Sequence, residues 1–287
     1  MRARLVALAW AAALDMLMVA WPAPAHATEP VEALVTSQSA DTVTVVRLAD
    51  LKVVGEIAVD GKPAGIALSP DRKRAYVTSP EGKVVTVIDA GARTIVTRFA
   101  AGSGPLGIAV NPRSGLIYVA DWYEHKVRSF DPADLRLVGE AGVGKSPSGV
   151  AVTADGALLL TADRDDNRVT LLDAATLTSR GTVAVGERPF GVTVSADGRR
   201  AYTANVGSDD VSVIDLGTRT LVGTVKVGRR PYAVALAEGR AFVTDQYSAT
   251  VTVFDTDTLA VLKTIGVGDY PEGIAADQSG RAVYVAC

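Results

Sequence analysis

The chain has 287 residues, and its 29 lysines and arginines against 32 aspartates and glutamates give a formal net charge of −3. This balance lacks the basic face on which general nucleic-acid binding depends, so nucleic acid is excluded as a partner. The one cysteine is Cys287, and only one of the two histidines, His125, lies beyond residue 27. This inventory excludes intramolecular disulfides and metal or haem sites built from His and Cys, and we expect no bound metal or other cofactor.

Residues 1–27 have the composition of a signal peptide. Arg2 and Arg4 supply a positive start, Leu5–Trp21 is mostly apolar, and Ala25-His26-Ala27 has the small-x-small form of a cleavage site. An uncleaved membrane anchor is the rival interpretation, but the 17 residues of Leu5–Trp21 include Asp15 and fall short of the ~20 apolar residues that a span needs. No cysteine lies near the cleavage site, so a lipid anchor is not expected. We predict cleaved export to a periplasmic or secreted location, with no membrane span after the signal is removed. Loss of two arginines and one aspartate moves the net charge from −3 to −4.

Beyond this leader the chain repeats itself. Six prolines mark equivalent points, spaced 42, 42, 42, 42 and 40 residues apart: Pro63, Pro105, Pro147, Pro189, Pro231 and Pro271. A fixed period of this length indicates an array of equivalent units rather than two domains. We expect one repeat domain over residues 28–287. It has an N-terminal partial unit at 31–62 and further units that start near residues 63, 105, 147, 189, 231 and 271.

Each unit contains four short apolar runs in the same order. In the unit that begins at Pro189 the runs are Gly191–Val194, Tyr202–Ala204, Val211–Ile214 and Leu221–Val227. Turn residues such as Asp197-Gly198 separate them, and Val, Ile, Thr and Tyr are frequent within them, as in the strands of antiparallel hairpins. The sequence therefore predicts an all-β propeller of four-stranded antiparallel blades, because radial repetition of such sheets protects their edges.

Three segments of that unit, Pro189–Val192, Ala201–Asn205 and Val211–Asp215, resemble the repeat of YVTN-family β-propeller proteins. The resemblance extends over nearly all of residues 31–287. The family includes surface-layer proteins, propellers like the quinoprotein amine dehydrogenase β chain, and periplasmic proteins associated with alcohol oxidation dependent on pyrroloquinoline quinone. The resemblance implies the fold, and it suggests an accessory role in quinone-linked alcohol or amine oxidation. So varied a family does not by itself define a function.

The strand count leaves two blade numbers open. The strands outside the five complete units are Glu32–Thr36, Thr42–Arg47, Val53–Val59, Gly273–Ala276 and Ala282–Ala286. The total of 25 strands fits neither the 24 of six blades nor the 28 of seven. We favour a seven-bladed lineage with an incomplete closing blade, because the family usually closes a seven-bladed ring with a strand from the C-terminus. In the six-bladed alternative, Gly273–Ala276 completes the first blade and the last strand is spare.

Two sets of loops should meet on one face, because strands alternate in direction within a blade. They are the loops that precede the repeated prolines and the loops that follow the second strands. Cations flanked by aromatic rings in these loops can bind a small anionic ligand or the acidic patch of a protein partner. These candidates are Lys62, Trp122, Tyr123, His125, Lys145, Arg164, Arg188, Phe190, Arg229, Arg230, Tyr232 and Tyr247. In the alternative interpretation they are ordinary solvated loop residues that nearby acids balance.

Acidic and amide residues recur at the ends of strands. The third strands end with Asp89, Asp131, Asp173, Asp215 and Asp255, and the second strands end with Asp121, Asp163, Asn205 and Asp245. Short polar side chains at such places accept hydrogen bonds from backbone N–H groups of the following turn. Because a catalytic site would break the symmetry of the repeats, we assign these residues to the architecture.

The chain contains no familiar motif for nucleophilic catalysis or phosphate binding. A lactonase-type hydrolase would hold its metal at the axis, where the residues after the prolines are Ala64, Leu106, Ser148, Phe190, Tyr232 and Glu272. They include one carboxylate, whereas a calcium site takes about six to eight oxygen ligands. We therefore predict a non-enzymatic, monomeric, extracytoplasmic binding or scaffold module that acts through its loop face. The quinone-oxidation accessory is the alternative, and a lactonase is least favoured.

Overall fold

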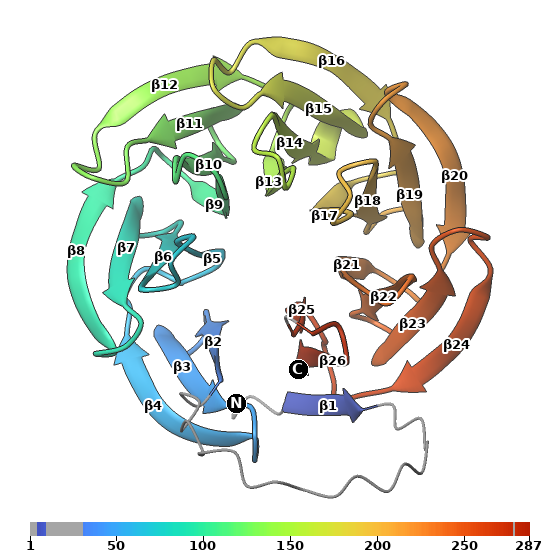
Figure 1. The fold of residues 1–287 in the computed structure, drawn as a ribbon, viewed down its shortest axis with the longest axis horizontal. Helices are drawn as coiled ribbons and strands as arrows, with labels where there is room; N and C mark the ends of the chain where they lie inside the picture. Colours follow the sequence, from blue (N-terminus) through green and yellow to red (C-terminus); the bar gives the residue numbers. More distant parts are fainter. Residues whose placement is uncertain (1–4, 10–30, 278) are drawn as a thin grey trace, which may run out of the picture.

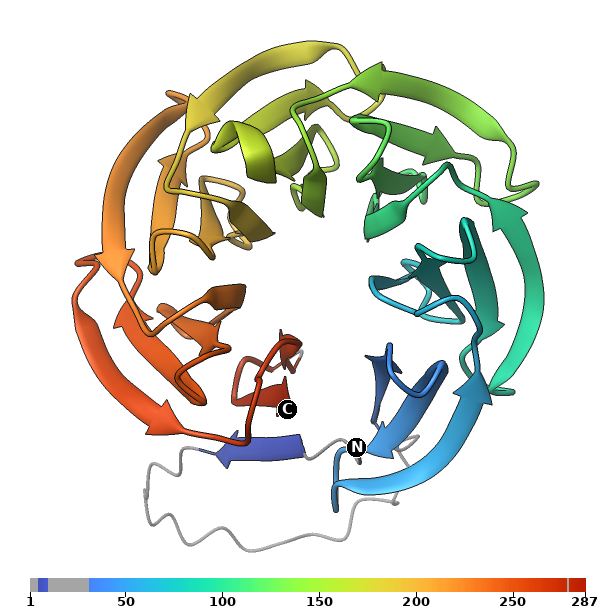
Figure 2. The ribbon, with the colours of Figure 1, turned by 180° about the vertical axis from the view of Figure 1, so that it is seen from behind.

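A computed structural model describes residues 5–9, 31–277 and 279–287, which form a ring of β-sheets (Figures 1 and 2). The 26 described strands lie in seven sheets, and paired strands run antiparallel. The predicted all-β propeller of four-stranded antiparallel blades is confirmed. The only helix among these residues is the single 3-10 turn η1 (Arg164–Asp166), and none there could cross a lipid bilayer. The predicted signal peptide, residues 1–27, lies outside the described residues except for residues 5–9.

Five blades are complete. In chain order they are β5–β8 (Ile66–Leu68, Arg74–Ser79, Val84–Asp89, Thr94–Ala100), β9–β12 (Pro105–Val110, Ile117–Asp121, Lys126–Phe130, Leu137–Gly142), β13–β16 (Pro147–Val152, Leu158–Asp163, Arg168–Asp173, Ser179–Ala184), β17–β20 (Pro189–Val194, Arg200–Asn205, Asp210–Asp215, Thr220–Lys226) and β21–β24 (Pro231–Ala237, Arg240–Asp245, Thr250–Asp255, Val261–Gly266). The first strand of each blade lies nearest the axis of the ring and the fourth forms the outer rim (Figure 1).

Two three-stranded sheets lie where the two ends of the ring meet. One contains β2, β3 and β4 (Glu32–Ser37, Thr42–Arg47, Lys52–Ala58), and the other contains β25, β26 and β1 (Ile274–Ala276, Ala282–Ala286, Leu5–Ala9). Strand β1 runs antiparallel along β26, from Leu5 opposite Ala286 to Ala9 opposite Ala282. The 26 strands are close in number to the 24 of six four-stranded blades, the predicted alternative. They are distributed over seven sheets, of which five have four strands and two have three. Within the described residues, β25 pairs with β26 and β2 pairs with β3.

The hydrophobic core lies between the blades. The middle strands are buried on both faces, as in β10, whereas the outer strands alternate between exposed and partly buried residues. One core cluster joins Tyr76 and Val87 of one blade to Ile117 and Phe130 of the next. Each sheet therefore buries its faces only against its neighbours, which is why the repeats must stack in a ring.

Near the axis the blades approach one another so closely that glycine is required. A Cβ atom built on Gly107 would lie 1.9 Å from the carbonyl oxygen of Ser148 in the next blade, and one on Gly149 would lie 2.4 Å from that of Phe190. Side-chain hydroxyls join the same strands, because Ser148 Oγ donates to the Phe190 carbonyl at 2.9 Å. The glycine that stands two residues after several of the repeat prolines therefore serves this contact.

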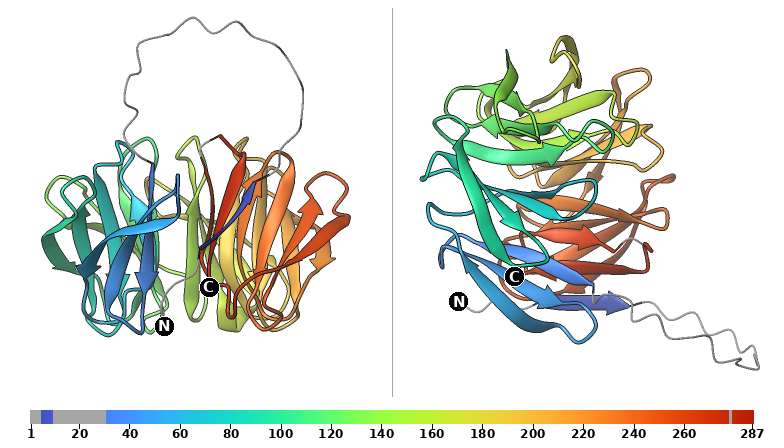
Figure 3. Two further views of the ribbon diagram at one scale, coloured as in Figure 1. Left: turned by 90° about the horizontal axis from the view of Figure 1, so that it is seen from below. Right: turned by 60° about the vertical axis from the view of Figure 1, so that its left-hand side comes forward.

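The strands run between the two faces of the ring (Figure 3). One face carries the turns that follow the first and third strands. The opposite face carries the loops between second and third strands and the loops that precede the repeat prolines, and we call it the loop face. Turns on the first-named face are held by the predicted acids: Asp173 Oδ1 accepts hydrogen bonds from the backbone N–H groups of Ala175 and Thr176 at 3.1 and 3.0 Å.

Candidate functional site

The two sets of loops are hydrogen-bonded to each other on the loop face. Backbone N–H groups in the loops after second strands donate to carbonyl groups in the proline-preceding loops. The distance is 2.9 Å from Trp122 to Gly104, 3.0 Å from Val206 to Arg188 and 3.0 Å from Gln246 to Arg230. The backbone therefore holds each pair of loops together.

A second contact between these loops recurs around the ring. A side chain in the loop after the second strand accepts a hydrogen bond from a backbone N–H group 21 residues later. The pairs are Asp41 with Lys62 at 2.9 Å, His125 with Ser146 at 3.1 Å, Asn167 with Arg188 at 2.8 Å, and Asp209 with Arg230 at 2.7 Å. All eight residues have positive φ, between 51° and 62°. The structure thus places His125, one of the predicted binding residues, at a position that Asp or Asn occupies in other repeats.

Two of the predicted cations lie beside acids. Lys62 Nζ lies 3.3 Å from Asp41 Oδ2, and Arg164 Nη1 lies 2.5 Å from Asp165 Oδ1. The Arg164 guanidinium also lies over the ring of Trp122, 5.5 Å from its centroid. Trp122 is half-buried, so these contacts hold both side chains against the loop face.

The other four cations have no such partner. Within the described part of the chain, Lys145, Arg188, Arg229 and Arg230 have no carboxylate within the 4.0 Å of an ion pair. Lys145, Arg188 and Arg229 are exposed, and Arg230 is half-buried. None of the four is therefore held in an ion pair, although the charges of Arg188 and Arg230 act on Asp165 and Glu272. Lys62 and Arg164, by contrast, are paired with acids.

The predicted aromatic residues other than Trp122 lie at three separate places. Phe190 and Tyr232, on neighbouring innermost strands, have ring centroids 4.3 Å apart. Burial, and then the charge of Glu272, raises the pKa of Tyr232 well above its ordinary value. Tyr123 lies by itself against Gly104, where a Cβ atom would come within 2.4 Å of the tyrosine ring. The remaining predicted ring, Tyr247, belongs to the surface described next.

Tyr247 lines a depression on the loop face of the β21–β24 blade. We call it the tyrosine–arginine depression; its volume is about 440 Å³, and it is lined by Arg229, Gln246, Tyr247, Ala249, Asp269 and Tyr270. The Arg230 guanidinium lies 4.9 Å from the centroid of Tyr247, and the rings of Tyr247 and Tyr270 meet edge to face at 6.2 Å. Three of the predicted residues, Arg229, Arg230 and Tyr247, are therefore brought together here.

Polar atoms without partners lie at or beside this depression. Gln246 is only 8% exposed; its Nε2 donates to Glu272 Oε1 at 2.5 Å. Gln246 Oε1 and Arg230 Nε are buried and make no hydrogen bond within the described residues. Desolvation raises the pKa of the Glu272 carboxyl, although the hydrogen bond from Gln246 and the charge of Arg230 oppose this.

Sequence reasoning did not select Gln246, Asp269 or Tyr270. The signal for two of them was present, because Asp269 and Tyr270 precede Pro271 as Arg229 and Arg230 precede Pro231. Alignment of the proline-preceding loops could have found them. The remaining predicted residues do not line this depression. Phe190 and Tyr232 lie on innermost strands, and the others belong to loops of other blades: Lys62, Trp122, Tyr123, His125, Lys145, Arg164 and Arg188.

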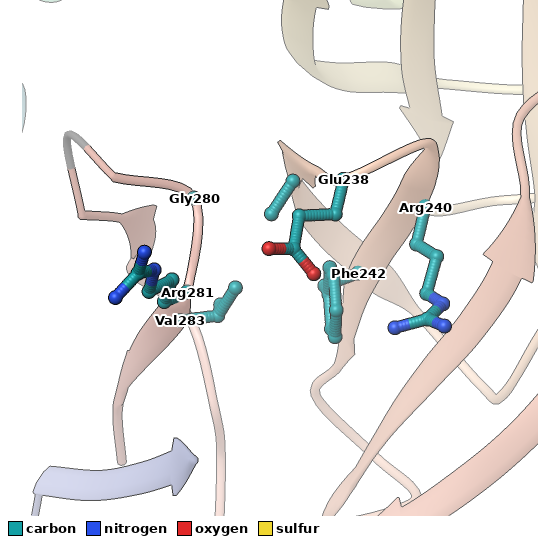
Figure 4. Close-up of a pocket in the computed structure, with 7 residues that line it drawn as sticks. Glu238, Arg240, Phe242, Gly280, Arg281 and Val283 are labelled. Carbon is teal, nitrogen blue, oxygen red and sulfur yellow. The ribbon is translucent and has the colours of Figure 1, made fainter. Parts of the chain in front are cut away.

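A second cavity lies on the opposite face, between the turns that precede β22 and β26 (Figure 4). It measures about 40 Å³ and is lined by Ala237, Glu238, Arg240, Phe242, Gly280, Arg281 and Val283. Organic ligands typically occupy ~300 Å³ or more, so this cavity is too small for one. Among the described residues, no group of three or more His, Cys, Asp or Glu side chains is arranged to hold a metal ion.

The acids at the ends of second strands are buried in hydrogen-bond networks. Asp163 is fully buried; its Oδ2 accepts from Thr170 at 2.5 Å and its Oδ1 from Thr161 at 2.8 Å. Burial raises the pKa of Asp163 although these hydrogen bonds lower it. Asp121 Oδ2 accepts from the backbone N–H of Ser103 and pairs with Arg128 at 2.8 Å. These contacts tie second and third strands to the loops above them, in agreement with the architectural assignment.

Comparison with known proteins supports a repeat propeller. A family model of the NHL repeat matches residues 103–130. Among solved structures, the fold is similar to that of a hydrazine synthase chain from Kuenenia stuttgartiensis, with a TM-score of 0.70 and 22% identity over 78% of this chain and 73% of that one. It is also similar to a functionally unknown protein from Desulfotomaculum acetoxidans DSM 771, with a TM-score of 0.73 and 18% identity over 87% and 83% of the two chains.

No curated protein matches the sequence. At identities of 22% and 18%, the structural similarities show the fold alone. The chain is thus a β-propeller repeat protein, and its assignment to the YVTN family or to quinoprotein-like propellers stays a prediction.

Proposed function

We propose that this protein is an exported, non-enzymatic binding module whose loop face engages a protein partner or a small anionic ligand. The observation that carries the proposal is the distribution of charge on that face. Four cations form no ion pair with a described residue, and two of them, Arg229 and Arg230, border exposed tyrosines. Arginine beside aromatic rings is enriched where proteins bind partners, because the guanidinium is weakly hydrated and stacks on the ring.

The scaffold supports the same conclusion. The strands and turns repeat from blade to blade, whereas the residues of the loop face differ between repeats. Loops held on a rigid scaffold are where binding residues concentrate, since their chemistry can change without loss of the core. The recurring hydrogen bonds between the two sets of loops provide that rigidity here.

Site-specific photo-cross-linking in the source cells tests this proposal. A photoreactive amino acid replaces Tyr123 or Tyr247, which are 67% and 52% exposed on the loop face. The matched control replaces Arg199, which lies in a turn of the opposite face and whose side chain is 84% exposed. We expect cross-links to one partner from the first two positions and none from the third. For a small ligand, the anionic fraction of a cell extract should raise the melting temperature of the protein. The proposal fails if cross-links do not depend on the face and no fraction stabilises the protein.

A further inference from the structure

The tyrosine–arginine depression combines cations with hydrogen-bond acceptors. Arg229 and Arg230 stand in consecutive positions of one proline-preceding loop, and neither forms an ion pair with a described residue. Asp269 lines the same depression and is also without an ion pair among these residues. The depression thus offers donors for a carboxylate and an acceptor for an N–H or O–H group.

Gln246 adds a second acceptor. Its amide nitrogen is occupied by Glu272, which orients the amide group, and its buried Oε1 has no partner in the described chain. A buried carbonyl oxygen without a hydrogen bond costs stability, and because Gln246 lines an open depression, a small shift of its side chain would bring this oxygen to a donor on a ligand. Arg230 Nε is also buried without an acceptor; Arg230 does not itself line the depression but lies against Tyr247, which does.

The aromatic rings hold Arg230 in place. Tyr247 lies under the Arg230 guanidinium at 4.9 Å, and Tyr270 meets Tyr247 at an interplanar angle of 88°. An arginine held on a ring loses less conformational entropy when it binds a carboxylate than a free arginine does. Both tyrosines remain more than half exposed, at 52% and 61%, and can contact aliphatic parts of a ligand.

We propose that the tyrosine–arginine depression binds a carboxylate-bearing peptide segment of a protein partner. Arg229 and Arg230 bind an Asp or Glu carboxylate of the peptide, and Gln246 Oε1 accepts a peptide N–H. This proposal rests on the proposed binding role of the loop face and names the class of ligand.

Two features favour a peptide over other anions. Inorganic sulfate would satisfy the arginines but carries no donor for Gln246 Oε1, and neither sulfate nor phosphate has an aliphatic segment for the exposed tyrosines. An acidic saccharide supplies hydroxyl donors, but the edge-to-face tyrosines provide no pair of parallel rings between which a sugar could lie. A peptide with acidic residues supplies a carboxylate, N–H donors and short aliphatic segments together.

Fluorescence polarisation with a labelled, N-acetylated and C-amidated peptide of alternating Glu and Gly tests the proposal. We expect saturable binding at low salt and about tenfold weaker binding for each of Arg229→Gln and Arg230→Gln, which is the loss of one charged hydrogen bond. Arg199→Gln, which makes the same change in net charge on the opposite face, should leave the affinity within about twofold. The exposed Arg229 side chain has no ion pair among the described residues, so Arg229→Gln should fold normally, which circular dichroism checks.

Several outcomes would overturn the proposal. They are no binding of the Glu–Gly peptide at millimolar concentration, equal binding of the matching Gln–Gly peptide, equal competition by inorganic phosphate, or tighter binding of trigalacturonate. Equal weakening by Arg199→Gln would also do so, because it would show attraction by net charge alone. If face-specific cross-links persist while the peptide does not bind, this inference fails and the binding role of the loop face stands. If the cross-links are also absent and no anionic fraction stabilises the protein, both fail.

Discussion

The Nδ1 atom of His125 accepts a hydrogen bond of 3.1 Å from the backbone N–H of Ser146. In another repeat, Asn167 makes the same contact with Arg188 at 2.8 Å. His125 and Asn167 have φ of 57° and 52°, a left-handed region in which Asn, Asp and His are enriched. The contact joins the loop after the second strand to the proline-preceding loop 21 residues later. His125 therefore helps to fix the positions of two loops of the loop face.

The first prediction follows from this equivalence. His125→Asn should leave the melting temperature close to that of the wild type, because Asn tolerates positive φ and supplies an acceptor. His125→Val should lower the free energy of unfolding by about 1–3 kcal/mol, because a β-branched residue is strained at positive φ and the Ser146 N–H loses its acceptor. Urea unfolding measures both. A valine variant as stable as the wild type would show that the contact contributes nothing.

The second prediction concerns Trp122, the one tryptophan that remains when residues 1–27 are removed. The Arg164 guanidinium covers one face of its ring, 5.5 Å from the centroid. Arg164→Ala should expose that face and shift the emission of Trp122 to longer wavelength. Arg188→Ala, at an exposed arginine of the next proline-preceding loop, should leave the spectrum unchanged. An unshifted spectrum in the Arg164 variant would contradict the stacked arrangement.

The third prediction concerns the exposed turn at Asp173. A hydrogen bond from the Arg180 guanidinium, and then bonds from Thr176, lowers the pKa of Asp173 from 3.8 to about 2. NMR titration should find this carboxyl ionised at pH 3. In Arg180→Ala the pKa should rise toward 3.8, since the largest cause of its depression is removed. If the pKa of Asp173 is the same in both proteins, the ion pair at 2.7 Å does not persist in solution.

The fourth prediction concerns Asp163, whose pKa is raised above 3.8 by burial, in contrast to the lowered pKa of Asp173. The folded state therefore binds the proton of Asp163 more tightly than the unfolded state does. Its contribution to stability is present below the unfolded pKa and is lost as the pH rises through the folded pKa. Asp163→Asn cannot titrate, so its stability relative to the wild type should increase with pH across that window. Asn205 occupies the equivalent position of the next blade, which indicates that the fold accepts the amide.

Asp173→Asn is the matched control for this experiment. Because the pKa of Asp173 is lowered, its contribution is present above about 3.8 and is lost as the pH falls through about 2. The stability of Asp173→Asn relative to the wild type should therefore decrease as the pH rises from about 2 to 3.8, whereas the window of Asp163 lies above 3.8. Urea unfolding at several acidic pH values measures both variants. Parallel trends in the two variants would contradict the opposite pKa shifts.

Much of the fold could be predicted because it depends on local pattern. The spacing of Pro63, Pro105 and their equivalents, the glycine near them and the four apolar runs identify one blade in each unit, and no blade can bury its faces alone. The strand count of 25 also agrees with the described strands other than β1. The pairing of β1 with β26 was not predicted, because a short apolar segment carries no signal for the strand beside which it lies.

The candidate site was only partly predictable. The sequence by itself determined that charged and aromatic residues such as Arg230 and Tyr247 lie in loops on one face, because strand direction alternates along each blade. Only the tertiary structure decided which cations are free: Lys62 is paired by an aspartate 21 residues earlier, whereas Arg230 lies on an aromatic ring. It also decided that Gln246 and Tyr270 line the depression. These contacts depend on left-handed residues and on packing between adjacent blades, and neither leaves a periodic pattern in the sequence.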